Sequence, residues 1–541
     1  MAAAAGHVNM MDDVLISNLP PVLLRSALRT LVSQGASTQR PFVEHIRKRL
    51  LESPPAFTDA SVLFPPGNDG LVSLECVRYI ASTRCLFSSK LAKAALPYLT
   101  HFLKSLREAR AQWARGDELD KVLDQISGDI VQAVQALKES KPEPTSTLLG
   151  ELQGFLASLE ALHSYCFNTA SQALGYPFTR AERQVRDVIS FLYPEAAASF
   201  PSPQAAKTIT ISVKERHVDI ETFQLGPHRM PRVFNGLWQL SSPAWGSASA
   251  ESQETALAEL VELGLSTADM ADHYGDAELI YGDFRNRLPA AMRDAVHAAT
   301  KWCVFGPIGQ PVTTQYVLQA VKERSRRLGG RVELLQFHWH DYSAKEYLDI
   351  LVELVRITQT YPQLVSAIGL CNFDAHHTEE ACKYLLEKTG VVGLVSNQVQ
   401  FSLIDSRPLQ HMSAVCERYG IKLLTYGSLY FDMVQNWGGW PEFQALLETL
   451  SSMADRQGEG ISLTNIASRW VLQQPNVGAV IVGNRLGVSS HAVENLNIFK
   501  FKLEDNDMAA INKIALGDDR YKTKAVFEKL GDCGNEYRAM H

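Results

Sequence analysis

From about residue 232, short apolar segments alternate with longer segments in which apolar residues recur every three or four positions. The short segments are typical of buried strands and the longer ones of amphipathic helices. The strand candidates are RVFNGLWQL, STADMAD, AVHAATKW, VELLQFHW, VSAIGLCNF, GLVSNQVQF, IKLLTYGS and GAVIVGN. Segments such as ESQETALAELVELG and EYLDILVELVRITQ separate them. These eight β-α units predict an α/β fold, a (β/α)8 TIM barrel over residues 222–521.

The first third of the chain has the helical pattern alone. In LPPVLLRSALRTLV, Leu24, Leu28 and Leu31 recur at helical spacing. A longer periodic stretch from about residue 73 is interrupted at Pro97, and further periodic segments follow. We expect amphipathic helices that each bury one face, in an all-helical domain over residues 13–194. This domain either packs on itself or binds a protein partner. A second enzyme is least favoured, because no nucleophile–base pair or metal-ligand spacing is visible.

The remaining segments connect or end these two parts, so we expect a multi-domain protein. Residues 1–12 are expected to be disordered, and residues 522–541 to form a C-terminal tail. Residues 195–221 include EAAASFPSPQAAKT, a small, proline-punctuated segment typical of a linker. The stretch TITISVKERHVDIETFQLG then alternates apolar and polar residues, which predicts a short hairpin or lead-in strand.

Composition narrows the possible partners and the cellular compartment. The 541 residues are 46% hydrophobic and 21% charged, with a net charge of −7. The chain contains no block of basic residues, which argues against nucleic acid as a main partner. The 8 cysteines form no CxxC pair, so reduced thiols in a cytoplasmic protein are expected. The N-terminus lacks the basic and apolar regions of a targeting signal, and no apolar run reaches the ~18 residues of a membrane span.

Polar side chains occur where three of the predicted strands end. A strand-like run ends in Asp269, within STADMAD, and Tyr274 follows five residues later; Lys301 and His338 lie near the ends of the next two predicted strands. Barrel active sites are built at the carboxyl ends of the strands. An acid, a phenol, a cation and an imidazole at this edge form a coherent proton-transfer set. Taken singly, Asp269 could instead be a helix cap, Lys301 a surface charge and Tyr274 a rim aromatic.

The motifs TADMADHYG, ATK and LLQFHWHD, in this order, resemble the catalytic signatures of the aldo-keto reductases. The resemblance covers about residues 223–521 and implies NADPH-dependent reduction of an aldehyde or ketone to an alcohol, or the reverse. The resemblance implies that Tyr274 is the proton donor. A free tyrosine phenol has a pKa of ~10, which is high for this role. A nearby ammonium should lower that pKa, and Lys301 would supply it. Asp269 would hold Lys301, and His338 would donate to the substrate oxygen.

The same resemblance implies the residues that hold the nicotinamide end of the cofactor. Cys371 and Asn372 in AIGLCNF and Gln398 in SNQVQF would hold the carboxamide. The family commonly has Ser at the position of Cys371, and a thiol is the weaker hydrogen-bonding group. Tyr426 would stack on the nicotinamide, although a buried core aromatic is the alternative. The remaining implied contacts lie in the TYGSL and NGLWQL segments: Gly427, Ser428, Gly236 and Trp238.

The segment VGNRLGVSSHAVENL resembles the family's adenosine-phosphate loop. The resemblance implies that Arg485 meets the 2′-phosphate, because a planar guanidinium suits phosphate. Glu494 and Asn495 would reach the adenine, and the cofactor would be NADPH (NADP+) rather than NADH. His338 and His340 lie two apart on a strand and could ligate a metal together. No third ligand suggests itself, so no metal is expected and His340 should line the pocket.

One stretch departs from the family pattern. In TYGSLYFDMVQNWGGW, Tyr430 runs directly into Phe431, and some two dozen residues of the expected pyrophosphate loop are missing. Backbone N–H groups of such a loop bind phosphate directly. The first alternative function is therefore a non-catalytic NADPH-binding or scaffold protein with a degenerate barrel. The second alternative is a poorly folding product of a faulty gene model.

Overall fold

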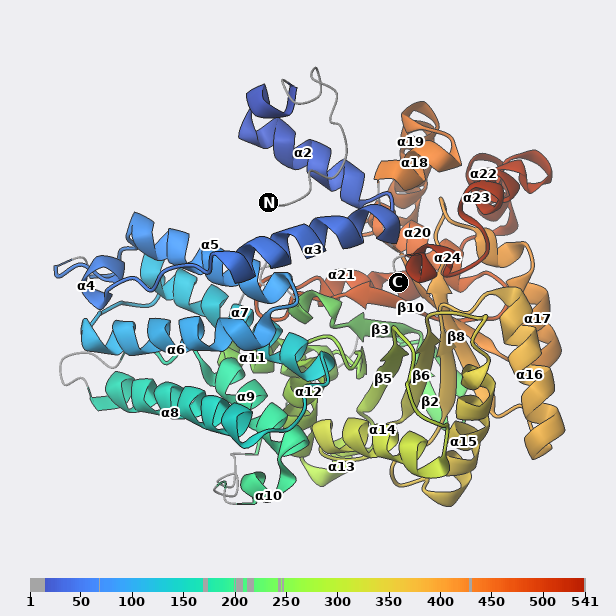
Figure 1. Ribbon diagram of the computed structural model, residues 1–541. Helices are drawn as coiled ribbons and strands as arrows, with labels where there is room; N and C mark the ends of the chain where they lie inside the picture. The colour runs from blue at the N-terminus through green and yellow to red at the C-terminus, as the bar shows by residue number, and fades with distance from the viewer. Residues whose placement is uncertain are drawn as a thin grey trace.

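The computed structural model describes residues 15–67, 69–168, 174–198, 200, 208–211, 218–241, 245, 248–427 and 431–539. A helical region comes first and a closed barrel follows, and the two lie side by side (Figure 1). The expected disordered N-terminus, much of the expected linker, and Ser428 and Tyr430 lie outside the described residues.

The predicted barrel is confirmed. Its strands are parallel and close into a ring in the order β10-β3-β4-β5-β6-β7-β8-β9. The strands are β3 Val233–Gly236, β4 Thr267–Asp269, β5 His297–Val304, β6 Leu334–Trp339, β7 Ile368–Cys371, β8 Leu394–Gln400, β9 Lys422–Tyr426 and β10 Val477–Gly483. Gly236 pairs with Asp269, and Lys301 pairs with Gln336, so the polar residues of neighbouring strands lie at similar levels.

Helices cover the outside of the barrel, as their apolar periodicity predicts. They are α11 Ala250–Glu262, α12 Ala277–Asn286, α13 Ala290–Arg293, α14 Thr314–Arg327, α15 Glu346–Thr360, α16 Ala375–Thr389, α17 Met412–Tyr419, α18 Phe431–Trp437, α19 Trp440–Gln457, α20 Leu463–Leu472, α21 Ala492–Leu496 and α22 Asp505–Ala515. Short 3-10 turns are η1 Trp238–Ser241, η3 Arg407–Leu409, η4 Asn497–Phe499 and η5 Asp518–Arg520. An antiparallel hairpin, β1 Thr222–Leu225 and β2 His228–Pro231, packs Leu225 and Met230 against the apolar interior of the strands.

The segment after residue 521 is helical and contacts the barrel. It contains α23 Tyr521–Leu530 and α24 Asn535–Arg538. Buried Arg407 binds Asp405 and Glu536, and Arg538 donates to the backbone oxygen of Asn372 at 2.6 Å. These contacts hold α24 next to the ends of β7 and β9.

The N-terminal region is helical, as predicted. Its helices are α2 Pro21–Val32, α3 Ala36–Glu52, α4 Ala60–Leu63, α5 Leu74–Ser88, α6 Ala92–Glu108, α7 Glu118–Glu139, α8 Ser146–Asn168, α9 Thr179–Leu192 and α10 Pro194–Ala197. Helices α4 to α9 enclose a second apolar core, separate from that of the barrel. In α7, Leu123, Ile126, Ile130 and Val134 recur every three or four residues and are buried.

Two expectations about these helices are wrong. The predicted break at Pro97 falls at Lys90, where a φ of +62° ends the helical path, and Pro97 lies in the second turn of α6. Helix α2 buries no residue, and Leu23 and Leu31 are about half exposed. Figure 1 shows the reason: α2 projects from the molecule and neighbours α3, away from the core of α4 to α9.

Candidate active site

The structure brings Asp269, Tyr274 and Lys301 together at the carboxyl end of the barrel. The Nζ of Lys301 donates to Oδ2 of Asp269 at 2.5 Å and to the backbone oxygen of Met270 at 2.9 Å. The same Nζ lies 3.5 Å from the hydroxyl of Tyr274. Asp269 and Lys301 are 3% exposed, so water screens this ion pair little.

Two glutamines complete the surroundings of the Asp269 carboxylate. Gln336 and Gln398 each donate from Nε2 to its Oδ1, at 2.8 and 2.7 Å. Gln398 also donates to Oε1 of Gln336 at 2.7 Å. With Lys301 on the other carboxylate oxygen, Asp269 accepts hydrogen bonds on both oxygens, and its orientation fixes the position of the ammonium group.

The direction of the Tyr274 pKa is opposite to the expected one. Burial raises the pKa of Tyr274, and the charge of Lys301 lowers it by less, so the net pKa is raised above that of a free phenol. Burial lowers the pKa of Lys301, but the charges of Asp269 and Tyr274, together with the hydrogen bond to Asp269, outweigh it and the net pKa is raised. The sequence indicated the ammonium and could not indicate how deeply the phenol is buried. At neutral pH the site therefore holds a protonated phenol beside a charged ammonium.

His338 lies on β6 and lines the same cavity as Tyr274 and Lys301. Its Nδ1 lies 3.1 Å from the backbone oxygen of Cys371. A carbonyl oxygen only accepts, so this hydrogen bond requires the proton on Nδ1. Donation to a substrate from Nε2 at the same time would then require the imidazolium form.

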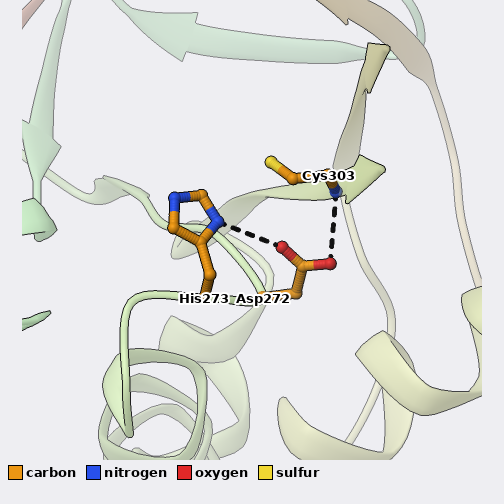
Figure 2. A group of neighbouring side chains, drawn as sticks. All are labelled: Asp272, His273 and Cys303. Atoms are coloured by element: carbon orange, nitrogen blue, oxygen red, sulfur yellow. Dashed lines mark hydrogen bonds and ion pairs between the residues drawn. The ribbon is translucent and has the colours of Figure 1, made fainter. Parts of the chain in front are cut away.

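The loop after β4 carries a second ordered group, shown in Figure 2. Asp272 accepts from Nδ1 of His273 at 3.3 Å and from the backbone N–H of Cys303 at 3.2 Å. Arg324 also donates to this carboxylate, at 3.3 Å. Burial raises the pKa of Asp272, but the hydrogen bond from His273 and the charge of Arg324 outweigh it, and the net pKa is lowered.

Carboxylate, imidazole and thiol are metal-ligand types, and one potential ligand atom of each residue in Figure 2 lies within 4.8 Å of the others. The Asp272 carboxylate, however, already has Arg324 as a cationic partner. Burial raises the pKa of the Cys303 thiol well above its usual value, which favours the protonated thiol. The contacts support an ordering role: the His273 ring packs edge-on against Tyr274 with 4.7 Å between centroids.

A cavity of about 470 Å³ opens above these residues. All four predicted catalytic residues line it, and so do most of the predicted nicotinamide contacts: Gly236, Trp238, Cys371, Asn372, Gln398, Tyr426 and Gly427. A Cβ on Gly236 would lie 3.0 Å from the side chain of Ile481, so a larger residue would crowd this wall. The amide and aromatic groups around one cavity fit the nicotinamide end of a dinucleotide.

Asn372 and Tyr426 are linked directly. The hydroxyl of Tyr426 donates to Oδ1 of Asn372 at 2.7 Å. Asn372 has a φ of +60°, a region that non-glycine residues seldom adopt, and Arg538 binds its backbone oxygen. The ring of Tyr537 lies 6.2 Å from that of Tyr426 and also lines the cavity, so α24 forms part of the wall.

The residues predicted to bind the adenosine end lie after β10, outside the lining of this cavity. Arg485 is exposed and donates to Ser489 at 3.2 Å. Glu494 accepts from Ser462 at 2.8 Å, and Asn495 is buried. The exposed guanidinium is accessible to a phosphate, whereas Glu494 and Asn495 contribute mainly to local packing in this structure.

Two details near the cavity differ from or limit the sequence prediction. His340 does not line the cavity, because β6 ends at Trp339 and the alternation of sides does not continue beyond it. The connection from β9 to α18 consists of residues 427–430 only, and of these the structure describes Gly427. In α18 the side chains of Val434 and Trp437 are buried against the barrel core.

Several cavity residues escaped the sequence prediction. Cys303 lies two residues after Lys301 on β5, so the side alternation of a strand could have found it, and the same alternation could have found Gln336, which is buried beneath the cavity two residues before His338 on β6. His273 lies directly beside Tyr274. Tyr537 gave no signal, because it comes from a distant segment expected to be a tail.

In the part of the chain that the structure describes, no helix has both the length and the apolar character needed to cross a membrane.

Comparison with known proteins agrees with this geometry. Methylglyoxal reductase DkgA of Yersinia pestis is 23% identical over 291 residues, which cover 53% of this chain and 90% of that protein. The Aldo-keto reductase of Mycobacterium sp. (strain MCS) is 26% identical over 278 residues, covering 50% of this chain and 85% of that protein. Aldose reductase B of Dictyostelium discoideum is 28% identical over 154 residues, or 28% of this chain, and the match spans only 42% of that relative. The model of the Aldo/keto reductase family matches residues 232–516, just over half of the chain, and the protein belongs to this family.

Proposed function

We propose that this protein is an NADPH-dependent oxidoreductase that reduces an aldehyde or ketone to an alcohol, or catalyses the reverse reaction. Membership of the aldo/keto reductase family supports an oxidoreductase that acts on small carbonyl compounds with a nicotinamide cofactor. The observation that carries the proposal is the contact of the partly buried Tyr274 phenol with the charged Lys301 ammonium, 3.5 Å apart, on the wall of a cavity.

In the proposed reaction Tyr274 is the proton donor. When bound, NADPH supplies the hydride that adds to the carbonyl carbon. The carbonyl oxygen then becomes an alkoxide, which takes the proton of the Tyr274 hydroxyl. Lys301 stabilises the resulting phenolate, and Asp269 keeps Lys301 charged and in place. The raised pKa of Tyr274 keeps the donor protonated at neutral pH.

His338 and the cofactor-binding residues complete the proposal. His338, held through Nδ1 by Cys371, would donate to the carbonyl oxygen as an imidazolium and orient it. Cys371, Asn372 and Gln398 would hold the carboxamide, with Tyr426 stacked on the ring. Contacts from Gly236, Trp238, Gly427 and Ser428 would enclose the nicotinamide. Arg485 would meet the 2′-phosphate, and Glu494 and Asn495 would reach the adenine. A cytoplasmic location and a protein partner of the helical region are further parts of this hypothesis.

The aromatic lining of the cavity around Tyr274 indicates the class of carbonyl substrate. The rings of Trp238, Trp245 and Phe305 line the cavity and are each more than a third exposed. These aromatic rings in the cavity lining favour small carbonyl compounds that carry an apolar or aromatic substituent.

Consumption of NADPH by the purified full-length protein tests the proposal. We expect turnover with methylglyoxal or with aromatic aldehydes, measured by the loss of NADPH absorbance. The second candidate function, NADPH binding without catalysis, is favoured by the short connection over residues 427–430. Saturable NADPH binding without turnover of any carbonyl compound would support that candidate and contradict the enzyme.

A further inference from the structure

The loop that carries Tyr274, residues 270–276, is held from two sides. From the barrel side, Lys301 binds the backbone oxygen of Met270, and Arg324 binds the carboxylate of Asp272. From the other side, the helical region contacts the same loop. Gln135 of α7 donates to the backbone oxygen of Asp272 at 3.0 Å, and Gln184 of α9 donates to Gln135 at 2.9 Å.

The strongest contact across this boundary is a bidentate ion pair. Arg180 of α9 donates from Nε and Nη2 to the two carboxylate oxygens of Asp276, at 3.0 and 2.6 Å. Arg180 is 7% exposed and Asp276 is fully buried. Two parallel charge-assisted hydrogen bonds fix both distance and orientation. Asp276 is two residues from Tyr274, so this pair constrains the loop close to the phenol.

A buried charge cluster extends the contact. Its centre is Asp187 of α9, which is paired with Lys138, Arg326 and Arg327. Arg327 is fully buried, and its Nη2 donates to the backbone oxygen of Gly275 at 2.6 Å. A carboxylate of the helical region thus holds the arginine that binds the residue next to Tyr274.

Packing adds a steric contact at the same place. Gly275 has a φ of +59°, and a Cβ built on it would lie 2.9 Å from Cγ1 of Val131 in α7. The loop backbone therefore lies directly against the helix, and the turn needs glycine for both its conformation and its closeness to α7.

We propose that the helical region is a positioning element for the Tyr274 loop and that Arg180 is its principal positioning residue. This inference rests on the proposed reductase function. The contacts of the helical region reach residues 272, 275 and 276, on both sides of the phenol. The Tyr274 hydroxyl lies at the limit of hydrogen-bond distance from Lys301, so a small displacement of the loop would separate donor and ammonium. Misplacement of a catalytic group by about 1 Å can reduce the rate about 100-fold.

The test compares Arg180→Gln with Arg183→Gln in the full-length protein. Arg183 lies on the same helix and forms a longer pair with Asp283, at 3.8 Å and partly exposed, which makes it a matched control. The measurements are kcat with a carbonyl compound, NADPH affinity by fluorescence, and hydrogen–deuterium exchange of a peptide covering residues 270–278. Arg180→Lys, which keeps the charge but loses the bidentate geometry, tests for partial rescue.

For Arg180→Gln we expect kcat to fall about 10- to 100-fold and exchange in residues 270–278 to accelerate. NADPH affinity should stay within about twofold, because the cofactor contacts lie elsewhere in the cavity. Arg183→Gln should leave both kcat and loop exchange unchanged. Arg180→Lys should give values of kcat and loop exchange between those of the wild type and Arg180→Gln. A folded Arg180→Gln protein with unchanged kcat and unchanged loop exchange would overturn the inference, and so would a loss confined to NADPH affinity.

Two further readouts keep the test decisive. If Arg180→Gln does not fold, Gln135→Met removes the contact with Asp272 at nearly constant side-chain volume and should raise the exchange of the loop alone. Unchanged exchange there would overturn the inference. If the wild-type protein reduces no carbonyl compound, the proposed function fails, and loop exchange still decides whether the helical region orders residues 270–276.

Discussion

Two polar clusters flank the Tyr274 loop, and both are buried except for Arg326 in the outer one. The inner cluster lies within the barrel and consists of Asp269, Lys301, Gln336 and Gln398. The outer cluster lies between the barrel and the helical region and consists of Asp187, Lys138, Glu323, Arg326 and Arg327. The inner cluster contacts the phenol and holds one cation at a fixed place. The outer cluster contacts the loop backbone and holds the loop itself.

The inner cluster serves the chemical step, and the outer cluster serves the stability and position of the loop. A change in the inner cluster should reduce the chemical step in a protein that still folds, because four barrel strands fix its backbone. A change in the outer cluster should reduce stability first, because it leaves an excess of buried positive charge between two apolar cores. The predictions below test this division in order of decreasing effect.

Tyr274→Phe should cause the largest loss. Without the hydroxyl there is no proton donor, and kcat should fall about 1,000-fold or more. NADPH affinity and thermal stability should change little, because the ring is kept. Tyr384→Phe is a suitable control, since that hydroxyl binds Asp349 far from the cavity. Wild-type turnover by Tyr274→Phe would show that another group donates the proton.

Asp187→Asn should cost about 3–5 kcal/mol of unfolding free energy, because Lys138 and Arg327 lose their common anion in a buried site. The quantity to measure is the midpoint of denaturant unfolding at neutral pH. A drop of less than about 1 kcal/mol would mean that the outer cluster adds little to folding. Glu160→Gln, which removes a more exposed partner of Arg186, is the control and should have a small effect.

The outer cluster also predicts a pH dependence. Burial raises the pKa of Asp187, but the charges of Arg327, Lys138 and Arg326 outweigh it, and the net pKa is lowered. A carboxyl group with a lowered pKa contributes stability above its unfolded value of about 3.9 and loses it as the pH falls below that value. Below about pH 4, the denaturant midpoint of the wild type should therefore decrease more steeply with falling pH than the midpoint of Asp187→Asn. Parallel pH profiles of the two proteins would contradict this assignment.

Gln336→Leu should have an intermediate effect confined to the inner cluster. It removes one donor to Asp269 and the acceptor of Gln398. With Asp269 less firmly oriented, Lys301 should be less well placed, and kcat should fall about tenfold. Steady-state kinetics should show the loss in kcat at saturating NADPH. A change in NADPH affinity alone would assign Gln336 to cofactor binding instead.

Arg485→Ala changes a residue outside both clusters and should affect cofactor binding alone. The exposed guanidinium should contribute to binding of the 2′-phosphate only, so the Kd for NADPH should rise about tenfold. The Kd for NADH serves as the internal control and should stay unchanged. Equal losses for both cofactors would remove the 2′-phosphate assignment.

The sequence predicted the barrel and the pairing of Asp269 with Lys301, because both rest on local patterns, but it did not indicate that Gln336 and Gln398 donate to Asp269. Strand-end polar residues and strand periodicity indicated Asp269, Lys301 and His338. The pKa of Tyr274 is raised by its burial in the folded protein, which no local sequence pattern indicates. The outer cluster joins Asp187 to Arg327 across 140 residues, and Tyr537 reaches Tyr426 from a segment that resembled a tail. In the sequence, these charged residues are indistinguishable from those on solvated helix faces.

The central claim is hydride transfer to a carbonyl carbon with protonation by Tyr274. The most direct test incubates the wild type and Tyr274→Phe with NADPH deuterated at the transferable position and with methylglyoxal or an aromatic aldehyde. With the wild type, the product should be an alcohol that carries one deuterium from the cofactor. With Tyr274→Phe at equal NADPH occupancy, almost no alcohol should form. An unlabelled product from the wild type, or equal labelling by both proteins, would contradict this claim.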